Sequence, residues 1–335
     1  MINQPKAVKL IKIYSIICDR FEKDLKYTCE RFSNNDKQDL TDQEIMTIYL
    51  FAVQEEQRFT IKQIHKYACD YLRDWFPKLG SYSAFSNRLN QLSEAFRSFT
   101  SSLFEEFLPS DCFANQSLLD SMPIITCSGK RNAKVAKELT DKGYCSTKSL
   151  YYYGVKLHAL AFRRLNKIPF PEEIQITPAS VNDLTVFKEA WSEKTNRNFF
   201  GDKIYNNLDF FSELEQEKNS IMMTPVKGVK GQCQEIKNRD KAANDLFSTA
   251  VSRVRQPIES LFNWLIQKTD IQRASKVRSA KGLLIHIFGK IASAFINLTF
   301  YSLIPIIYET NKNCIHFYIV FNNKLFQFSL ITKST

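Results

Sequence analysis

Three acidic residues, each beside apolar neighbours, are the strongest candidates for chemistry in this sequence. Asp120 follows a pair of leucines, Asp202 follows Phe-Phe-Gly, and Glu259 lies within the run Pro-Ile-Glu-Ser-Leu-Phe. Because a carboxylate is costly to bury alone, three such residues make sense if folding brings them together around a divalent cation. Carboxylate oxygens suit Mg²⁺ or Mn²⁺. Two such ions, about 4 Å apart, stabilise the attacking and leaving oxygens of a phosphodiester displacement.

Cationic residues near these acids are candidates for holding phosphates. Arg255 precedes Glu259 by one helical turn, so it either pairs with that acid or holds a phosphate. Lys156 and His158 lie two residues apart, so on a strand they share a face, which could point toward the acids. An ordinary helix-surface ion pair and ordinary polar strand positions would explain the same residues, so spacing alone leaves these roles open.

The charge of the chain favours a polyanionic partner. The 335 residues carry 46 lysines and arginines against 35 acids, a formal net charge of +11. Residues 127–167 alone contain ten lysines and arginines against two acids, Glu138 and Asp141. This basic block indicates either a nucleic-acid contact or an ordinary solvated surface.

The cysteines and the N-terminus suggest a cytoplasmic protein. The eight cysteines are scattered, without a C-x-x-C pair or a zinc-like Cys/His spacing, so we expect reduced thiols. The first 14 residues lack the apolar run of a secretory signal. The apolar stretch 283–307 carries His286, Lys290 and Asn297, so we favour a buried C-terminal helix over a membrane span.

Residues 1–110 are predicted to form a helical domain. Thr41 with Glu44 forms a capping box, and Thr60 is placed to open a further helix. The helices near 60–97 are compatible with a helix-turn-helix, although periodicity alone favours a plain helical bundle. The polar residues of the later helix that we expect to face outward are Ser86, Asn87, Arg88 and Asn90.

Residues 111–310 are predicted to form an α/β domain with a mixed sheet flanked by helices. The expected order is strands 113–119, 151–162 and 173–177, helix 182–191, strand 198–201, helix 208–217, strand 220–226, a long basic and polar connection, and a helix from Ile258. Asp120 would end the first strand and Asp202 would follow the fourth. If those strands are neighbours, both acids reach one edge of the sheet, where open α/β sheets place ligands. A small β-hairpin turning at Asn322-Asn323 is expected in 311–335.

Seven short motifs follow one another along the chain with a specific order and spacing. They are Leu119-Asp120-Ser121-Met122-Pro123-Ile124, Gly129-Lys130-Arg131, Gly143-Tyr144-Cys145-Ser146-Thr147, Tyr153-Gly154-Val155-Lys156-Leu157-His158, Thr177-Pro178-Ala179-Ser180-Val181-Asn182-Asp183, Gly201-Asp202-Lys203-Ile204-Tyr205 and Arg255-Gln256-Pro257-Ile258-Glu259. In this order they resemble a bacterial insertion-sequence transposase of the DDE type, over roughly 40–300 of the chain.

The resemblance implies an RNase H-like core in which Asp120, Asp202 and Glu259 are catalytic ligands of Mg²⁺ or Mn²⁺. It also implies that the strands bearing the two aspartates pair side by side. The N-terminal region is implied to bind DNA. The implied partners are the terminal inverted repeats of the element, target DNA and further copies of the chain on DNA, with no membrane.

Four positions depart from the family pattern. Ser252 stands where a related signature has Tyr, Ile266 where it has Lys, and Ile204 where similar chains often have Gly. Pro257 lies two residues before Glu259, so a helix either starts near Gln256 or is kinked there.

The resulting hypothesis is metal-dependent cleavage and joining of DNA strands at the ends of an insertion element. Backbone phosphates would be held by the basic candidates Lys130, Arg131, Lys156, His158, Arg253, Arg255, Arg273, Lys276 and Arg278. The alternatives are a decayed transposase that only binds DNA, a nuclease with the same core that cuts without joining, and a membrane-associated protein.

Overall fold

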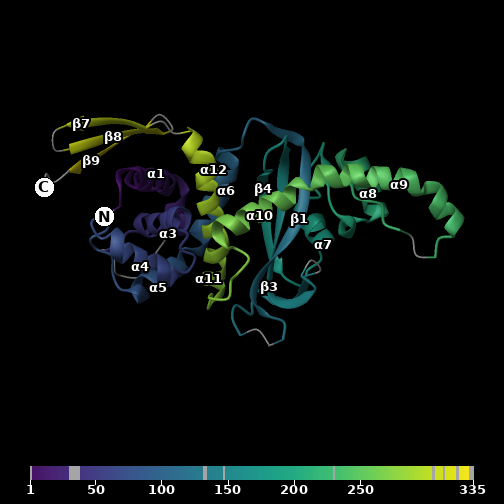
Figure 1. Cartoon of the computed structure of the whole chain (residues 1–335), viewed down its shortest axis with the longest axis horizontal. Coiled ribbons are helices and arrows are strands. Elements are labelled where there is room, and N and C mark those ends of the chain that lie inside the picture. The colour runs from purple at the N-terminus through teal and green to yellow at the C-terminus, as the bar shows by residue number, and fades with distance from the viewer. Residues whose placement is uncertain are drawn as a thin grey trace. The chain divides into compact units, whose positions relative to one another are not determined.

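The structure is a computed structural model in which two compact units can be described. The structure describes residues 2–29, 38–130, 134–145, 148–228, 231–303, 306–311, 314–321 and 324–331. Side chains are described for those of these residues up to Ile296 and for Leu298. The first unit comprises residues 1–103, 268–271 and 281–335, and the second comprises 104–267 and 272–280 (Figure 1). The prediction that these regions divide into a DNA-binding part and a catalytic part stays a prediction.

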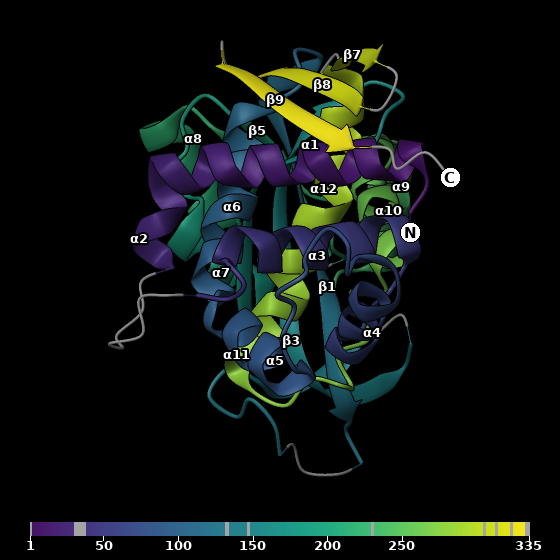
Figure 2. The ribbon, with the colours of Figure 1, turned by 90° about the vertical axis from the view of Figure 1, so that its left-hand side faces the viewer.

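Apart from three C-terminal strands described below, the first unit is helical, as predicted for the N-terminal region. Its N-terminal helices are α1 (Gln4–Arg20), η1 (Phe21–Leu25), α2 (Lys26–Thr28), α3 (Asp42–Glu56), α4 (Ile61–Tyr71), α5 (Tyr82–Gln91) and most of α6 (Ser93–Glu106). The C-terminal part of the chain adds most of α11 (Ala280–Leu284), η3 (Ile285–Gly289) and α12 (Lys290–Leu303). Both α1 and α12 pack against α3, as Figure 2 shows. The predicted capping boxes are confirmed, with Thr41 at the start of α3 and Thr60 at the start of α4.

The pair α4 and α5 lies where a helix-turn-helix was considered, but Arg88 does not face outward as expected. Its guanidinium donates to both carboxylate oxygens of Asp42, at 2.8 and 2.6 Å, and to the carbonyl of Cys29 at 2.6 Å. Arg88 therefore ties α5 to the start of α3. Asn87 is exposed, and Ser86 and Asn90 are partly buried.

The apolar stretch near the C-terminus forms a buried helix, as favoured, although α12 ends at Leu303, earlier than expected. Its two basic side chains, His286 and Lys290, bond to backbone carbonyls of residues 270–271. His286 Nε2 lies 2.7 Å from the carbonyl oxygen of Ile271, and Lys290 Nζ donates to the carbonyl of Asp270 at 3.1 Å. Burial, reinforced by the charge of Lys290, lowers the pKa of His286 to about 3, and burial lowers the pKa of Lys290 to about 7. Within the described part of the chain, no helix is long and apolar enough to cross a membrane.

The C-terminal residues form a three-stranded antiparallel sheet in the order β7-β8-β9. The strands are β7 (Ile306–Asn311), β8 (Cys314–Phe321) and β9 (Lys324–Ile331). The expected hairpin corresponds to β8 and β9, which pair from Phe321 with Lys324 onward, while its turn at Asn322-Asn323 lies outside the described residues. The strand β7 was not predicted, because its first residues were taken as the end of the preceding helix.

The second unit is built on a mixed sheet, as predicted. Its path is β2-β3-β1-β5-β6, and β4 pairs with β3. The strands are β1 (Cys112–Ser128), β2 (Asp141–Cys145), β3 (Leu150–Arg164), β4 (Phe170–Pro178), β5 (Asn198–Phe200) and β6 (Ile221–Met223). The expectation that the first strand ends at Asp120 was wrong, because β1 runs on to Ser128. Strand β2 was not predicted.

Helices α7 (Asp183–Ala190) and α8 (Leu208–Lys218) cover the sheet and close its core. The buried side chains that pack together there are Leu119, Leu160, Phe187, Trp191, Phe199, Tyr205, Leu214 and Met222. Strands β1 and β3 approach closely at Gly154, where an added Cβ would lie 2.0 Å from the carbonyl oxygen of Ile124. Through Leu119 and Phe199, this core fixes the part of β1 before Asp120 and strand β5, from which the site is built.

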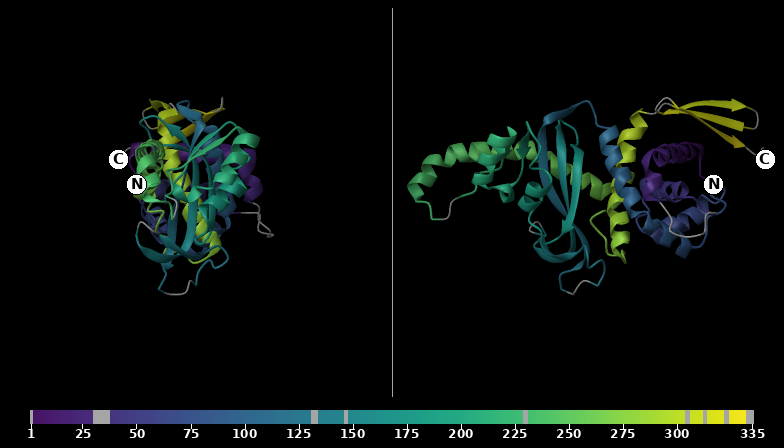
Figure 3. Two further views of the ribbon diagram at one scale, coloured as in Figure 1. Left: turned by 90° about the vertical axis from the view of Figure 1, so that its right-hand side faces the viewer. Right: turned by 180° about the vertical axis from the view of Figure 1, so that it is seen from behind.

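The expected long connection after β6 is instead largely a helix, α9 (Gln234–Arg255), followed by α10 (Pro257–Thr269). Figure 3 shows α9 reaching beyond the sheet. Val251 is its one buried residue among those described, although Ala243, Phe247, Val251 and Val254 recur at helical spacing, so the sequence interpretation overlooked a helical pattern among many charged and polar residues. The contacts of α9 with β1 and β5 bring its last turn to the sheet.

Candidate active site

The two aspartates lie just beyond the paired segment of two neighbouring strands. Strands β1 and β5 pair in parallel, and their last paired residues are Leu118 and Phe200. Asp120 and Asp202 each follow two residues later. The predicted pairing of these strands is therefore confirmed, and it places both acids just beyond the point where the strands part.

Glu259 reaches the site because the chain breaks between two helices. Helix α9 ends at Arg255, and α10 begins at Pro257, which places Glu259 in the first turn of α10. Proline is tolerated in a first turn because the amide hydrogen it lacks has no partner within the helix. The expectation that a helix starts near Gln256 is confirmed.

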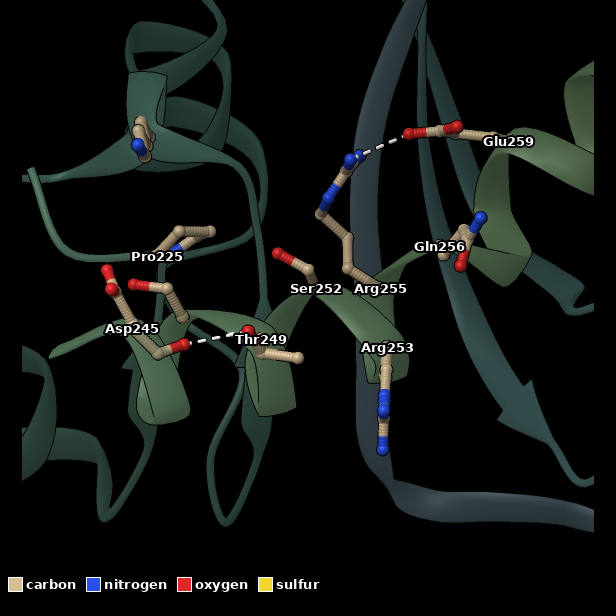
Figure 4. A pocket seen from close by; sticks show the side chains of 10 residues that line it. Pro225, Asp245, Thr249, Ser252, Arg253, Arg255, Gln256 and Glu259 are labelled. Carbon is tan, nitrogen blue, oxygen red and sulfur yellow. Dashed lines mark hydrogen bonds and ion pairs between the residues drawn. The ribbon is translucent and has the colours of Figure 1, made fainter. Parts of the chain in front are cut away.

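Arg255 joins two of the three acids. Its Nη1 donates to Oδ2 of Asp120 at 2.8 Å, and its Nη2 donates to Oε1 of Glu259 at 2.7 Å. Figure 4 shows the second of these contacts at the junction of the two helices. Of the two alternatives for Arg255, pairing with an acid is the one seen here. The same guanidinium links β1 to α10.

Asp202 completes the group from the loop after β5. Its carboxylate accepts a hydrogen bond from the backbone N–H of Ile204 and thereby caps a short 3-10 turn, Lys203–Tyr205. Among the described residues, the buried hydroxyl of Tyr205 has no hydrogen-bond partner. Burial is the main cause that raises the pKa of this phenol, and the charges of Asp183, Asp120 and Asp202 add to the shift.

The charges of the three acids act on one another. Burial raises the pKa of Asp120 to about 6, while Arg255 and the N–H of Ser121 oppose this shift, and Asp202 and Glu259 add to it. A carboxylate in such surroundings favours either a proton or a nearby cation. Among the described residues, no three aspartate, glutamate, histidine or cysteine side chains lie close enough together to bind a metal ion. Arg255 bonds to two of the acids, Asp120 and Glu259.

A pocket of about 730 Å³ opens beside Arg255 and Glu259 (Figure 4). One face of α9 lines most of it, and Lys203 and Pro225 contribute from the loops after β5 and β6. Arg253, one of the predicted phosphate contacts, also lines the pocket. The pocket therefore presents Lys203, Arg253 and Arg255 together with Glu259 of the candidate acids and with Asp245.

Lys156 and His158 lie on one side of β3, as expected, but they bond to the protein interior. Lys156 Nζ donates to Oδ1 of Asp183 at 2.9 Å and to the carbonyl of Val181 at 2.8 Å. The side chain of His158 is 0% exposed, and its Nε2 lies 2.8 Å from Oγ1 of Thr177. Burial lowers the pKa of His158 to about 4, so the ring is neutral at pH 7. Contrary to expectation, His158 is therefore not placed to hold a phosphate in this conformation.

Asp183 is a residue that the sequence argument did not single out. Its Oδ2 accepts a hydrogen bond from Oγ of Ser121 at 2.9 Å, and its Oδ1 accepts the one from Lys156. Ser121 follows Asp120 directly, so Asp183 fixes the strand at the first acid. It stands in the fifth of the seven motifs, a signal that could have identified it.

The other basic candidates lie along the second half of β1. Residues 272–274 join β1 through hydrogen bonds from Ile125 N to Gln272 O at 2.8 Å and from Ala274 N to Ile125 O at 2.9 Å. Lys130, after β1, and Arg273, beside β1, are exposed, as are Lys276 and Arg278 on the segment that follows Arg273. Arg131 lies outside the described residues.

The family to which the chain belongs agrees with this geometry. The family described as "Transposase DDE domain" matches residues 112–295, which is more than half of the chain and includes all three acids. This match and the mixed sheet flanked by helices confirm the predicted RNase H-like fold class. Comparisons with curated proteins and with solved structures gave no match. The chain belongs to the transposase DDE domain family.

Proposed function

We propose that this chain is a transposase that cleaves DNA and joins strands at the ends of an insertion element with divalent metal ions. The observation that carries the proposal is the convergence of Asp120 and Glu259 on Arg255, with the charge of Asp202 acting on the same site. The family match supports the same reaction class.

The three acids fit Mg²⁺ or Mn²⁺ by their donor chemistry. Carboxylate oxygens are preferred ligands of both ions. Asp120 is costly to ionise where it lies, and a divalent charge beside it would offset that cost. When bound, such ions supply activation of the attacking hydroxyl and stabilisation of the leaving oxygen.

Arg255 would change partners when DNA is bound. In the described conformation it pairs with both Asp120 and Glu259, so both acids are held in place by a cation of the chain itself. With the acids engaged elsewhere, the guanidinium is free to donate two parallel hydrogen bonds to a phosphate, for which its planar geometry is suited. Arg255 would then hold the DNA backbone beside the reacting bond.

The path of DNA would follow the exposed cations. Lys130, Arg273, Lys276 and Arg278 would contact backbone phosphates along β1, and Arg253 would do so from the pocket. Helices α4 and α5 would supply base recognition at the inverted repeats. Further copies of the chain would assemble on the DNA ends.

Cleavage of a duplex that carries the terminal repeat of the element tests the proposal. We expect Mg²⁺-dependent cutting by the unaltered chain and its loss in Asp120→Asn and Asp202→Asn. Asp209→Asn, a change at an exposed acid on α8, is the matched control and should cut normally. Unchanged cutting in both site variants would refute the assignment.

A second duplex added as target separates the related functions. Joined products support a transposase, and cutting without joining supports a nuclease. Binding without any cutting supports a protein that has lost catalysis.

A further inference from the structure

Two exposed tyrosines form an aromatic surface that the proposed catalysis does not use. Tyr144 on β2 lies directly across from Tyr151 on β3, and the two residues are 52% and 60% exposed. Their ring centroids are 4.9 Å apart, with the planes inclined at 53°. Such a pair of large exposed rings marks an interaction site more often than a single exposed ring does.

The backbone under the rings is held by close packing. On the opposite face, Cys145, Tyr152 and Ala179 form a small buried cluster. The N–H of Gly129 donates to the carbonyl of Tyr151 at 2.9 Å, and an added Cβ on Gly129 would lie 2.6 Å from that residue. The two rings are therefore presented from a fixed position.

The charge beside the rings is positive. Lys142 is two residues before Tyr144 and so shares its face, and its Nζ lies 5.2 Å from the centroid of the Tyr151 ring. The neighbouring acid, Asp141, points to the opposite face, where it accepts a hydrogen bond from Oγ of Ser180 at 2.7 Å. Rings and a cation together match the bases and the phosphates of a nucleic-acid strand.

We propose that Tyr144, Tyr151 and Lys142, here called the tyrosine surface, stack unpaired bases of a DNA strand and hold its backbone. Exposed aromatic side chains beside a cation are the usual means of binding single strands, because every base offers a flat face. A duplex hides those faces, so an unpaired strand is the partner that uses both the rings and the charge. The choice of DNA rests on the proposed function.

Binding of fluorescent oligonucleotides to the full chain, without metal, tests this inference. The probes are a thymidine single strand, a strand of the same length without bases, and a duplex. We expect the chain to prefer the strand with bases, and Tyr144→Leu or Tyr151→Leu to weaken that binding by about fivefold or more. Neither change should alter binding of the baseless strand, and Tyr151→Phe should keep the preference.

Two further variants sharpen the measurement. Lys142→Gln should weaken binding of both single strands. It should also make the slope of log affinity against log salt concentration shallower by about 0.7. Phe113→Leu is the matched control, because Phe113 on β1 is 38% exposed and has the guanidinium carbon of Arg163 5.7 Å from its ring centroid. It should bind all three probes normally.

Equal losses on strands with and without bases would overturn the inference, as would unchanged binding in both tyrosine variants. A change in oligomeric state caused by either leucine variant would instead assign the surface to a protein contact and also overturn it. Because binding is measured without metal, failure of DNA cleavage leaves this result intact. Likewise, a chain without any preference for the strand with bases can still cut DNA, so that result does not decide the cleavage test.

Discussion

Replacing Asp120 with asparagine is expected to stabilise the metal-free protein at neutral pH. Burial is the main cause that raises the pKa of Asp120 from 3.8 to about 6, against the opposing effect of Arg255. A raised pKa means that the folded state prefers the protonated form. The stability that this preference contributes is complete below about pH 4 and is lost as the pH rises through about 6.

The size of the effect follows from the two pKa values. The difference between 3.8 and about 6 corresponds to about 3 kcal/mol. Asparagine resembles the protonated acid in shape and charge. Asp120→Asn should therefore raise the free energy of unfolding by up to about 3 kcal/mol at pH 8 and by almost nothing at pH 4. For a domain of this size, the midpoint of thermal unfolding would rise by roughly 6 to 12 °C at most.

Thermal unfolding in the presence of a chelator, between pH 4.5 and 8, measures this effect. Asp111→Asn is a control of opposite sign, because hydrogen bonds from Arg164 and Lys167 lower the pKa of Asp111 to about 2. That variant should lose stability at neutral pH, by less than about 1 kcal/mol because the pair is exposed. A lower midpoint for Asp120→Asn at pH 8, or a difference that does not change with pH, would refute the reasoning.

Three further changes test other parts of the structure. Gly154→Ala should lower the free energy of unfolding by roughly 3 kcal/mol or more, since its Cβ would meet a carbonyl of β1 at 2.0 Å, and chemical denaturation measures this. Asp183→Asn should slow cleavage about tenfold at saturating DNA without changing DNA affinity, because it loosens the contact with Ser121; an altered affinity alone would contradict this role. Arg88→Gln should lower thermal stability by about 3 kcal/mol through loss of its paired bonds to Asp42, whereas an unchanged midpoint would show that the pair is unimportant.

Much of the sheet could be predicted from residue types, because β1, β3 and β5 contain apolar runs that fill the core. Other elements gave a weaker signal. In helix α9, Ala243, Phe247, Val251 and Val254 do recur at helical spacing, but charged and polar residues outnumber them and only Val251 is buried among those described, so the segment was taken as a polar connection. Strand β2 is short and includes Asp141, Lys142 and Gly143, which are unfavourable strand residues.

The sequence predicted which residues belong to the candidate site better than it predicted how they contact one another. The apolar neighbours of the three acids and the order of the motifs identified Asp120, Asp202 and Glu259. The spacing of Arg255 and Glu259 allowed either pairing or phosphate binding, and only the fold decides between them. The burial of His158 was missed because a period of two predicts that residues share a face without telling which face is buried, and β3 lies inside the sheet.

Calorimetric titration with Mn²⁺ tests most directly whether the three acids form one cation site. The account predicts that the unaltered chain binds Mn²⁺ at pH 7.5 and that Asp120→Asn, Asp202→Asn and Glu259→Gln each weaken this binding by at least about tenfold. Equal Mn²⁺ affinity in the unaltered chain and all three variants would contradict it.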